Sequence, residues 1–469
     1  MIKLPQEFEI RMQDMLKEAY PAFLHSYEKE NFRSLRVNAL KGSTEQFLEY
    51  GLFSLKPVAW EKNGFYYSEE DQPGRHPMHE AGLYYIQEPS AMAPAAYIGA
   101  EPGEKILDLC AAPGGKTTQI ASYLQNKGIL VCNEIHPQRA KILSENVERM
   151  GITNAVVTNE TPKHLAELFE GYFDRILVDA PCSGEGMFRK NEEAVEEWSP
   201  ENVRLCADRQ DEILDCADIM LREGGRLVYS TCTFAPDENE GSIARFIKRH
   251  PDYEIEKIPL YDGMSTGVAD WCKDVEAPEN IESTIRLFPH RLDGEGHYLA
   301  VLRKKGEVRE GYQGFVKNGL EQGLSAKEQK NLSDFDEFVK ATLNDDVLCG
   351  IRDRLLKFGD QLYLMPAGMP SVKGMKVLRP GLHLGTLKKN RFEPSHALAL
   401  ALKPDQVKHT MELYTEDNDN MTNAYLNGMT LNHEGEKGWY LMTYRGYSIG
   451  WGKLAGQIMK NHYPKGLRK

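Results

Sequence analysis

The sequence predicts an α/β fold built on a doubly wound sheet with helices on both faces. Three observations lead to this prediction. Apolar, strand-like runs alternate with helix-length segments through the middle of the chain, which favours a parallel sheet. A turn rich in small residues follows the first of these runs. The last part of the chain instead holds aromatic-rich runs separated by a tight turn, which indicates a separate, small β-rich domain.

Residues 1–95 are expected to form an N-terminal α+β subdomain. Residues 5–19 read as an amphipathic helix, residues 35–38 as a strand, and an aromatic segment lies at 65–67. Residues 96–305 follow as the core domain. Its strand-like runs lie at residues 105–110, 129–132, 155–157, 175–178 and 226–229.

The ends of these strands carry acids and a thiol. Asp108, Glu134, Asp179 and Cys232 each stand at or just after one strand. In doubly wound sheets, ligands bind outside the carboxyl ends of the strands. Any one of these residues alone would be read as an ordinary strand-end residue, but four at four strand ends predict a functional site.

The turn after the first strand is predicted to hold a cofactor. Small residues let the backbone approach a ligand closely, and the helix that follows offers free N–H groups to an anionic group. The spacing matches neither the dinucleotide-binding fingerprint nor a P-loop. Glu134, after the second strand, is placed to accept hydrogen bonds from a ribose diol. The predicted cofactor-binding turn comprises Cys110, Ala111, Ala112, Pro113, Gly114, Gly115 and Lys116.

The C-terminal part divides into two predicted units. Residues 306–385 are expected to form a small intermediate module with one charged helix at 326–341. Residues 386–469 hold strand-like runs on either side of a turn at Arg445-Gly446. This unit resembles the PUA-like barrels that hold structured RNA. Its aromatic residues are interpreted either as the barrel core or as platforms for RNA bases: Trp439, Tyr440 and Trp451.

Composition sets the wider frame. The 469 residues suffice for about three domains, and 41% hydrophobic with 27% charged residues is typical of a globular protein. No run resembles a signal peptide or is long enough to span a membrane, so we expect a cytoplasmic protein. The eight cysteines show no spacing typical of zinc sites.

The net charge of −13 argues against nucleic-acid binding only if the charge is evenly spread. Acidic residues concentrate at 191–201 and 416–420, and residues 453–469 carry five Lys or Arg and no acid. RNA therefore remains an expected partner, with a monomer as the default state.

Three motifs together carry a family resemblance. They read LDLCAAPGGKT at 107–117, VDAPCSGEG at 178–186 and YSTCTF at 229–234. The chain resembles the Nop/Sun-type RNA cytosine carbon-5 methyltransferases, within them the bacterial ribosomal RNA branch with an extra C-terminal PUA-like module. Further motifs of the family stand at residues 36–38, 85–90, 288–291 and 296–298.

The resemblance implies a Rossmann-like class I methyltransferase core, S-adenosylmethionine as the cofactor and a covalent mechanism. Carbon 5 of cytosine is too poor a nucleophile to take a methyl group until a thiolate has added to carbon 6. By resemblance, Cys232 is that nucleophile, Asp179 contacts N3, and Cys182 assists release of the product. A donor role would require Asp179 to be protonated, and hence a raised pKa.

Several alternatives stay open. DNA cytosine methyltransferases use the cysteine of a Pro-Cys motif, which Pro181-Cys182 matches, but the element at 231–233 favours Cys232 as nucleophile. The adenine contact is predicted at Asn159 or Glu160. Lys116, Arg189 and Lys190 are candidates for holding the target nucleotide, although the last two could simply belong to a solvated loop. The expected substrate is small-subunit ribosomal RNA; transfer RNA, a non-catalytic ribosome-assembly role and, least favoured, a small-molecule substrate are the alternatives.

Overall fold

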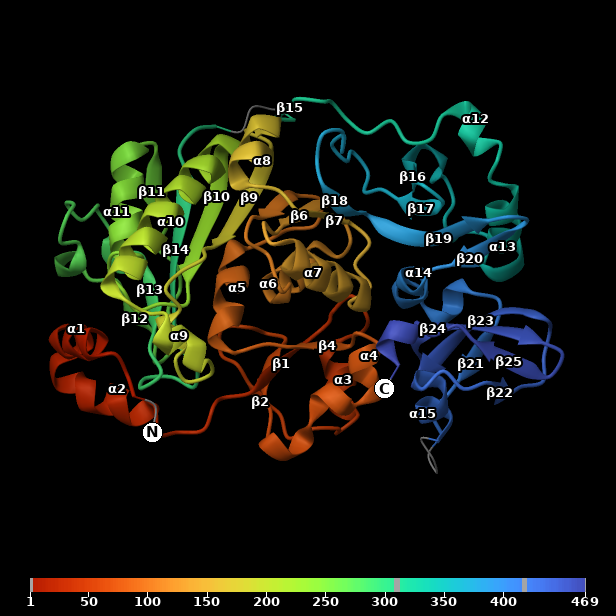
Figure 1. The fold of residues 1–469 in the computed structure, drawn as a ribbon, viewed down its shortest axis with the longest axis horizontal. Helices are drawn as coiled ribbons and strands as arrows, with labels where there is room; N and C mark the ends of the chain where they lie inside the picture. The colour runs from red at the N-terminus through yellow and green to blue at the C-terminus, as the bar shows by residue number, and fades with distance from the viewer. Residues whose placement is uncertain (1–2, 308–312, 416–419, 469) are drawn as a thin grey trace.

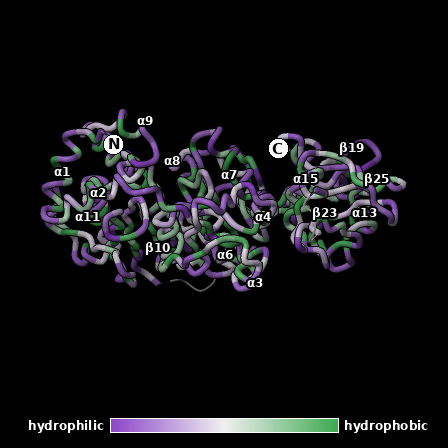
Figure 2. The backbone as a smooth tube through the Cα atoms, turned by 90° about the horizontal axis from the view of Figure 1, so that it is seen from below, coloured by the Kyte–Doolittle hydropathy of each residue, from purple (hydrophilic) through white to green (hydrophobic). Residues whose placement is uncertain are grey.

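The computed structural model describes residues 3–307, 313–415 and 420–468. The molecule is elongated, with the N-terminal helices and the central sheet toward one end and the C-terminal modules at the other (Figures 1 and 2). The predicted acidic stretch at 416–420 lies almost entirely outside the described residues.

The N-terminal subdomain combines two helices with a small antiparallel sheet. Helix α1 covers Gln6–Leu16, continues as a 3-10 turn to Ala19, and buries Phe8 and Met12, one helical turn apart. Helix α2 covers Tyr20–Ser26. The sheet has the order β2-β3-β1-β4, and its elements and helices are β1 (Ser34–Val37), α3 (Thr44–Glu49), β2 (Lys56–Pro57), β3 (Gly64–Tyr66), α4 (Pro77–Glu80), β4 (Tyr84–Ile86) and α5 (Ala93–Ile98).

The central sheet has ten strands, and all five predicted core strands are present. They are β5 (Lys105–Asp108), β6 (Ile129–Asn133), β7 (Ala155–Thr158), β9 (Phe173–Asp179) and β10 (Leu221–Thr231). These five run parallel in the order β10-β9-β5-β6-β7.

The edges of the sheet depart from the predicted parallel arrangement. Strand β14 (His297–Lys304) pairs antiparallel with β10, and β18 (Val377–Pro380) pairs antiparallel with β7. Strand β18 comes from the C-terminal half of the chain, so its direction is set by a returning segment rather than by a crossover helix. The outer strands are β11 (Tyr253–Ile255), β12 (Ser265–Thr266) and β13 (Ile285–Leu287).

Helices cover both faces of the sheet, as predicted (Figure 1). Along β9, Ile176 and Val178 point into the core shared with α8 and α10, whereas Leu177 points into the core shared with α6 and α7. This alternation explains why the strands read as continuous apolar runs. The helices are α6 (Gly115–Leu124), α7 (Pro137–Arg149), α8 (Pro162–Leu168), α9 (Glu192–Glu196), α10 (Pro200–Met220) and α11 (Glu240–Arg249).

The C-terminal half contains two further sheets. The first has the order β16-β17-β19-β20, with bounds Leu355–Phe358, Gln361–Leu364, Leu382–Lys388 and Arg391–Pro394. The second has the order β21-β23-β24-β25-β22, with bounds Thr410–Glu412, Gly438–Tyr444, Tyr447–Ala455, Ile458–Asn461 and Leu431–Asn432. Between and beside them lie α14 (His396–Ala401) and α15 (Asn420–Leu426), and a two-stranded pair joins β8 (Phe169–Glu170) to β15 (Phe315–Val316).

One sequence expectation changes in this half. The single helix at 326–341 is two helices, α12 (Ala326–Gln329) and α13 (Ser333–Thr342), because the chain turns between them and buries Leu332. The expected division at 385/386 falls inside β19, which pairs on both sides within one sheet.

The aromatic residues of the predicted barrel are core residues. Trp439, Tyr440 and Trp451 are only 9%, 3% and 1% exposed. The Trp451 indole N–H donates to the Ser395 carbonyl at 2.9 Å. The core interpretation is therefore confirmed, and base stacking on these rings is not indicated.

Candidate active site

The carboxyl ends of the five parallel strands form one continuous edge. Asp108, Glu134, Asp179 and Cys232 all lie at this edge, because their strands are neighbours in the sheet. A cavity of about 680 Å³ opens there. Of the predicted site residues, those that line it are Cys110, Ala112, Glu134, Asp179, Cys182 and Cys232.

Cys182 and Cys232 lie together, although 50 positions separate them in the sequence. Their strands pair in parallel with Asp179 opposite Ser230, so each cysteine follows its strand end by a few residues. The two Sγ atoms are 3.3 Å apart. The hydrogen bond to Cys232, and then burial, raise the pKa of Cys182 well above its ordinary value. The Cys182 thiol therefore retains its proton in the free enzyme.

A buried carboxylate fixes the loop that carries Cys182. Glu238 accepts hydrogen bonds from the Ser183 N–H at 2.9 Å, from the Ser183 hydroxyl, and from the Gln210 amide at 2.8 Å. The same Gln210 amide donates to the Pro181 carbonyl at 3.0 Å. Burial, and next the charge of Glu185, raise the pKa of Glu238 to about 7. The backbone is thus held on both sides of Cys182.

Gly186 joins the two cysteine loops. Its N–H donates to the Cys232 carbonyl at 2.8 Å. A Cβ at this position would lie 2.9 Å from both the Cys232 and the Gly296 carbonyl oxygens, closer than side-chain carbons approach in real structures. Only glycine permits this approach, which sets the spacing between the two thiols.

Asp179 is ionised, contrary to the expectation of a raised pKa. Burial favours the neutral acid, but Lys116 and His297 outweigh it and hold the pKa of Asp179 well below its ordinary value. Lys116 Nζ lies 2.8 Å from Asp179 Oδ2, the Ser230 hydroxyl donates to Oδ1 at 2.7 Å, and His297 Nε2 is 3.9 Å from Oδ1. Burial lowers and Asp179 raises the pKa of Lys116, with a net upward shift. The expectation failed because the sequence did not show which cation would face the carboxylate.

The cofactor-binding turn is held by residues from outside the core domain. Arg36 donates to the Gly115 carbonyl at 3.0 Å and to the Thr118 hydroxyl at 2.8 Å. A Cβ on Gly115 would meet the Gln87 amide at 3.2 Å. Residues of the motifs at 36–38 and 85–90 therefore contact the cofactor-binding turn directly. From the core side, Arg139 donates to the Ala112 carbonyl at 2.8 Å.

Two acids at this end fit S-adenosylmethionine, which carries an amino-acid group and a ribose diol. Glu134 lines the cavity, and its Oε1 accepts the His136 N–H at 2.8 Å. Asp108 lies beneath the turn, where Thr117 donates to Oδ2 at 2.6 Å while Oδ1 is buried without a hydrogen-bond partner among the described residues. Burial raises the pKa of Asp108 to about 7, against the hydrogen bond from Thr117.

Asn159 and Glu160 do not line the cavity. The Asn159 amide donates to the Glu134 and Ile135 carbonyls at 2.7 and 2.8 Å. The Glu160 carboxylate accepts the Lys376 N–H at 2.6 Å and contacts His164. Asn159 thus supports the Glu134 backbone, while Glu160 anchors the segment that leads into β18.

Arg189 is not part of a solvated loop, whereas the neighbouring Lys190 is exposed. The Arg189 side chain is only 3% exposed and donates to the Lys29 and Glu30 carbonyls, both at 2.9 Å. Lys190 Nζ lies 3.4 Å from Glu295. Arg189 therefore ties the segment after α2 to the Cys182 loop.

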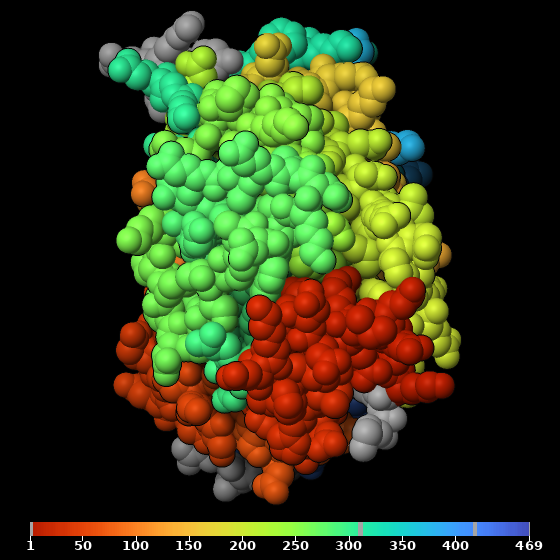
Figure 3. Space-filling view, turned by 90° about the vertical axis from the view of Figure 1, so that its left-hand side faces the viewer, coloured from red at the N-terminus to blue at the C-terminus, as the bar shows by residue number. Residues whose placement is uncertain are grey.

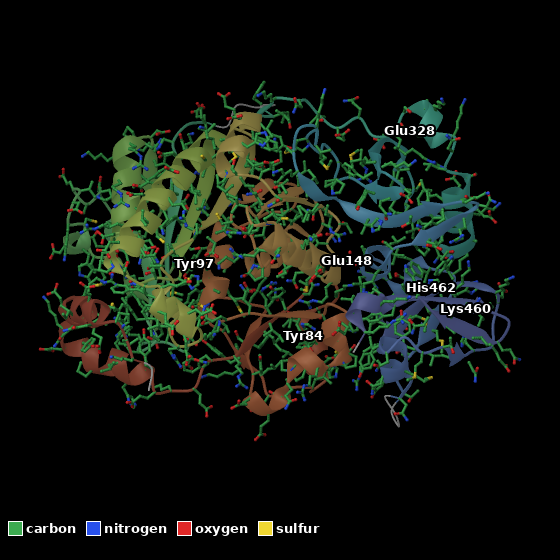
Figure 4. All side chains as sticks on the ribbon, in the orientation of Figure 1. Tyr84, Tyr97, Glu148, Glu328, Lys460 and His462 are labelled. Carbon is green, nitrogen blue, oxygen red and sulfur yellow. The ribbon has the colours of Figure 1, made fainter. Side chains whose placement is uncertain are left out.

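The N-terminal helices cover this end of the site. Phe8 and Phe23 pack with Phe188 and Phe234, which flank the two cysteine loops in sequence. Figure 3 shows the red N-terminal helices lying against the green segment of the core domain. Arg11 also donates to Glu185, a fully buried carboxylate next to Gly186.

Sequence reasoning missed several residues of this network. Glu238 and Gln210 carry no motif, since a carboxylate in the turn before α11 and an amide within α10 resemble surface residues in the sequence. His297 stood inside the quoted motif at 296–298, which was the one signal that could have identified it. In the described residues no group of three or more His, Cys, Asp or Glu is arranged to hold a metal ion, and no helix is long and apolar enough to cross a membrane.

Four family models match successive parts of the chain. They are the N-terminal domain of 16S rRNA methyltransferase RsmF at 4–89, 16S rRNA methyltransferase RsmB/F at 95–303, the RsmF rRNA methyltransferase first C-terminal domain at 337–402 and the methyltransferase RsmF PUA domain at 413–469.

Relatives match along almost the whole chain. The ribosomal RNA small subunit methyltransferase F of Erwinia tasmaniensis is 31% identical over 99% of this chain and 96% of its own length. That of Escherichia coli O157:H7 is 30% identical over 99% of this chain and 97% of its own.

Solved structures share the fold. A methyltransferase homolog from Pyrococcus horikoshii has a TM-score of 0.58 at 29% identity, covering 65% of this chain and 96% of its own. NSun6 from the same organism, with a TM-score of 0.55 at 22% identity over 65% of this chain and 99% of its own, shows likeness of fold.

The fold and the site together define an S-adenosylmethionine-dependent RNA methyltransferase, with a Rossmann-like core and a C-terminal PUA domain. More narrowly, the chain belongs to the 16S rRNA methyltransferase RsmB/F family, with the domains of its RsmF members. The family resemblance seen in the sequence is confirmed.

Proposed function

We propose that the protein methylates carbon 5 of a cytosine in small-subunit ribosomal RNA through a covalent adduct with Cys232. The observation that carries this proposal is the pair of thiols 3.3 Å apart beside the cavity, of which Cys182 keeps its proton. A non-catalytic assembly factor would have no use for a pair held so closely. The names of the relatives favour small-subunit ribosomal RNA over transfer RNA.

Cys232 acts first in this mechanism. Its thiolate adds to carbon 6 and forms the C–S bond, and the electrons of the 5,6 double bond make carbon 5 nucleophilic while charge builds toward N3. The ion pair of Asp179 and Lys116, with Nζ 2.8 Å from Oδ2, faces this charge. Because Asp179 is ionised, it cannot donate a proton to N3. We therefore assign that donation to Lys116, and we assign to Asp179 the role of orienting Lys116. S-adenosylmethionine, when bound, supplies an electrophilic methyl group to carbon 5.

Cys182 acts in the release step. The proximity of Cys232 is the largest cause of the raised pKa of Cys182. Once Cys232 is bonded to carbon 6, it no longer carries a thiolate charge, so Cys182 releases its own proton to water more readily and becomes a thiolate. Cys182 then accepts the proton from carbon 5, the electrons restore the double bond, and Cys232 leaves as a thiolate.

The cofactor contacts are proposed for the turn at 110–116, with Glu134 at the ribose. Asn159 is assigned a supporting role, since its amide holds the Glu134 carbonyl. We further propose that the enzyme works as a monomer in the cytoplasm. All eight cysteines are free thiols, which suits a reducing compartment.

The division into domains is also a proposal. Residues 1–95 and 96–305 are kept as the RNA-facing subdomain and the methyltransferase core. The intermediate module extends from 306 through α14, because its sheet continues to Pro394. The PUA-like domain then begins near residue 410.

The test uses Cys182→Ala protein incubated with S-adenosylmethionine and cellular RNA. If Cys182 serves release, a heat-stable protein–RNA adduct accumulates on a denaturing gel, and sequencing its RNA identifies the substrate. The adduct must vanish in the Cys182→Ala/Cys232→Ala variant, while Cys349→Ala, which removes an exposed cysteine, serves as the matched control. Absence of both adduct and methyl transfer on RNA and on isolated subunits would favour the assembly factor.

A further inference from the structure

A second cavity lies where three parts of the chain meet, away from the catalytic edge. It has a volume of about 810 Å³. Its walls come from the segment before α3, from the ends of α6 and α7, from the segment after α14, and from the hairpin tip between β23 and β24. Helix α14 contacts both α7 and β24 (Figure 1), and its last residues, Leu400 and Ala401, line this interdomain cleft.

The side chains that line the interdomain cleft are mainly cationic or neutral. Among the described lining residues, three are cationic, Lys41, Lys403 and Arg445, and one is acidic, Asp405. The whole chain shows the opposite balance, with 57 Lys and Arg against 70 Asp and Glu. A local reversal of charge in an acidic protein marks a surface suited to an anion.

Lys41 has a backbone carbonyl, and no carboxylate, as its hydrogen-bond partner among the described residues. Its ammonium group donates to the Leu400 carbonyl. Burial, and then the neighbouring charge of Lys403, lower the pKa of Lys41 to about 7, and no carboxylate opposes the shift. Two like charges facing one cleft cost free energy unless a ligand of opposite charge joins them.

The guanidinium of Arg445 is held in place by contacts with Tyr414 on one side. It lies over the Tyr414 ring, 4.1 Å from the centroid, and its Nη2 donates to the Tyr414 hydroxyl at 2.7 Å. Its Nε is buried and without a hydrogen-bond partner among the described residues. A planar cation anchored on an aromatic ring at a hairpin tip is suited to phosphate recognition.

We propose that the interdomain cleft formed by Lys41, Lys403 and Arg445 binds phosphates of the RNA backbone. The proposal rests on the proposed function, because it needs RNA as substrate. His136 and Arg139, at the start of helix α7, line the cofactor cavity, and Gly151, two residues after its end, lines the cleft. The 13 residues of α7 span about 20 Å, so one structured RNA reaches both sites.

The test measures RNA binding as a function of salt. Full-length wild type, Lys403→Met and Lys41→Met are titrated with small-subunit ribosomal RNA at several salt concentrations. Each lost phosphate contact should weaken binding several-fold at low salt and reduce the slope of log K against log salt by about 0.7 to 1. At saturating RNA, kcat should stay unchanged while KM rises, because the interdomain cleft does not touch the reacting base.

Lys389→Met is the matched control. Lys389 is exposed in the turn between β19 and β20 and lies outside the cleft. An unchanged slope in Lys403→Met, or an equal reduction in Lys389→Met, overturns the proposal. Because Lys403 is exposed, its variant decides the matter even if Lys41→Met fails to fold.

The outcomes also separate this proposal from the catalytic one. A reduced salt slope in Lys403→Met, together with a wild-type protein that transfers no methyl group, would support the interdomain cleft and contradict the covalent mechanism. Normal formation of the covalent adduct, together with an unchanged salt slope in Lys403→Met, would support the covalent mechanism and contradict the interdomain cleft.

Discussion

The catalytic edge and the interdomain cleft both hold charged side chains, but the partners of those charges differ between the two regions. Glu238 accepts three hydrogen bonds, and Asp179 contacts Lys116, Ser230 and His297. At the cleft, Lys41 donates only to a backbone carbonyl, and the neighbouring charge of Lys403 lowers its pKa. Covalent chemistry needs fixed geometry, which saturated hydrogen bonds supply, whereas phosphate binding needs charge left available for the ligand.

The largest expected effect is that of a substitution at Cys232, which should affect the catalytic edge and leave the interdomain cleft unchanged. Cys232→Ala should abolish methyl transfer and adduct formation, because no other thiol at the edge is available as a thiolate. Its affinity for RNA and its salt slope should equal those of the wild type. A methyl-transfer assay and RNA titration of one preparation check both halves. Residual transfer above background would assign the nucleophile to Cys182 instead.

Glu238→Gln tests whether the catalytic edge depends on a buried acid. A carboxyl group whose folded pKa of about 7 exceeds its unfolded value of 4.5 stabilises the fold fully below pH 4.5 and loses that contribution as pH rises to 7. The shift corresponds to on the order of 3 kcal/mol.

We therefore expect the free energy of unfolding of the wild type to fall between pH 4.5 and 7 more steeply than that of Glu238→Gln, as measured in urea. The variant should also accumulate some covalent RNA adduct, because the Cys182 loop is held less well. Glu192→Gln, on the exposed α9, is the control. Identical pH profiles would contradict the assignment.

Gly186→Ala tests the spacing between the two thiols. The added methyl group would press on two carbonyl oxygens, so the cysteine loops must separate. Misplacement by about 1 Å costs on the order of 100-fold in rate. We expect that loss in kcat, with RNA affinity unchanged, in single-turnover assays. Gly184→Ala, which meets no atom within 4 Å but has a φ of +72°, controls for backbone strain alone.

Asn159→Ala should have the smallest effect. Its amide supports the Glu134 and Ile135 carbonyls and does not line the cavity, so we expect cofactor affinity to fall less than about tenfold, the equivalent of roughly 1 kcal/mol for a hydrogen bond. Calorimetric titration with S-adenosylmethionine measures this. Glu134→Ala should lose more, and the reverse order would return Asn159 to the cofactor contacts.

Some of this edge was predictable because strand periodicity and local motifs are properties of neighbouring residues. The five core strands, the turn at 110–116 and the placement of Glu134 and Cys232 after strand ends followed from apolar runs and small residues. The hairpin around Arg445-Gly446 followed from its turn residues in the same way.

The sequence by itself determined the five core strands and their alternation with helices, the residues at the strand ends and the family, since each depends on local patterns. Only the tertiary structure decided that Lys116 keeps Asp179 ionised, that Glu238 and Gln210 hold the Cys182 loop, and that β18 joins the central sheet. It also brought Lys41 next to Lys403, more than 300 positions away in the chain. The physical reason is that pKa values and hydrogen bonds depend on distances across the fold, which the spacing of residues along a chain does not specify.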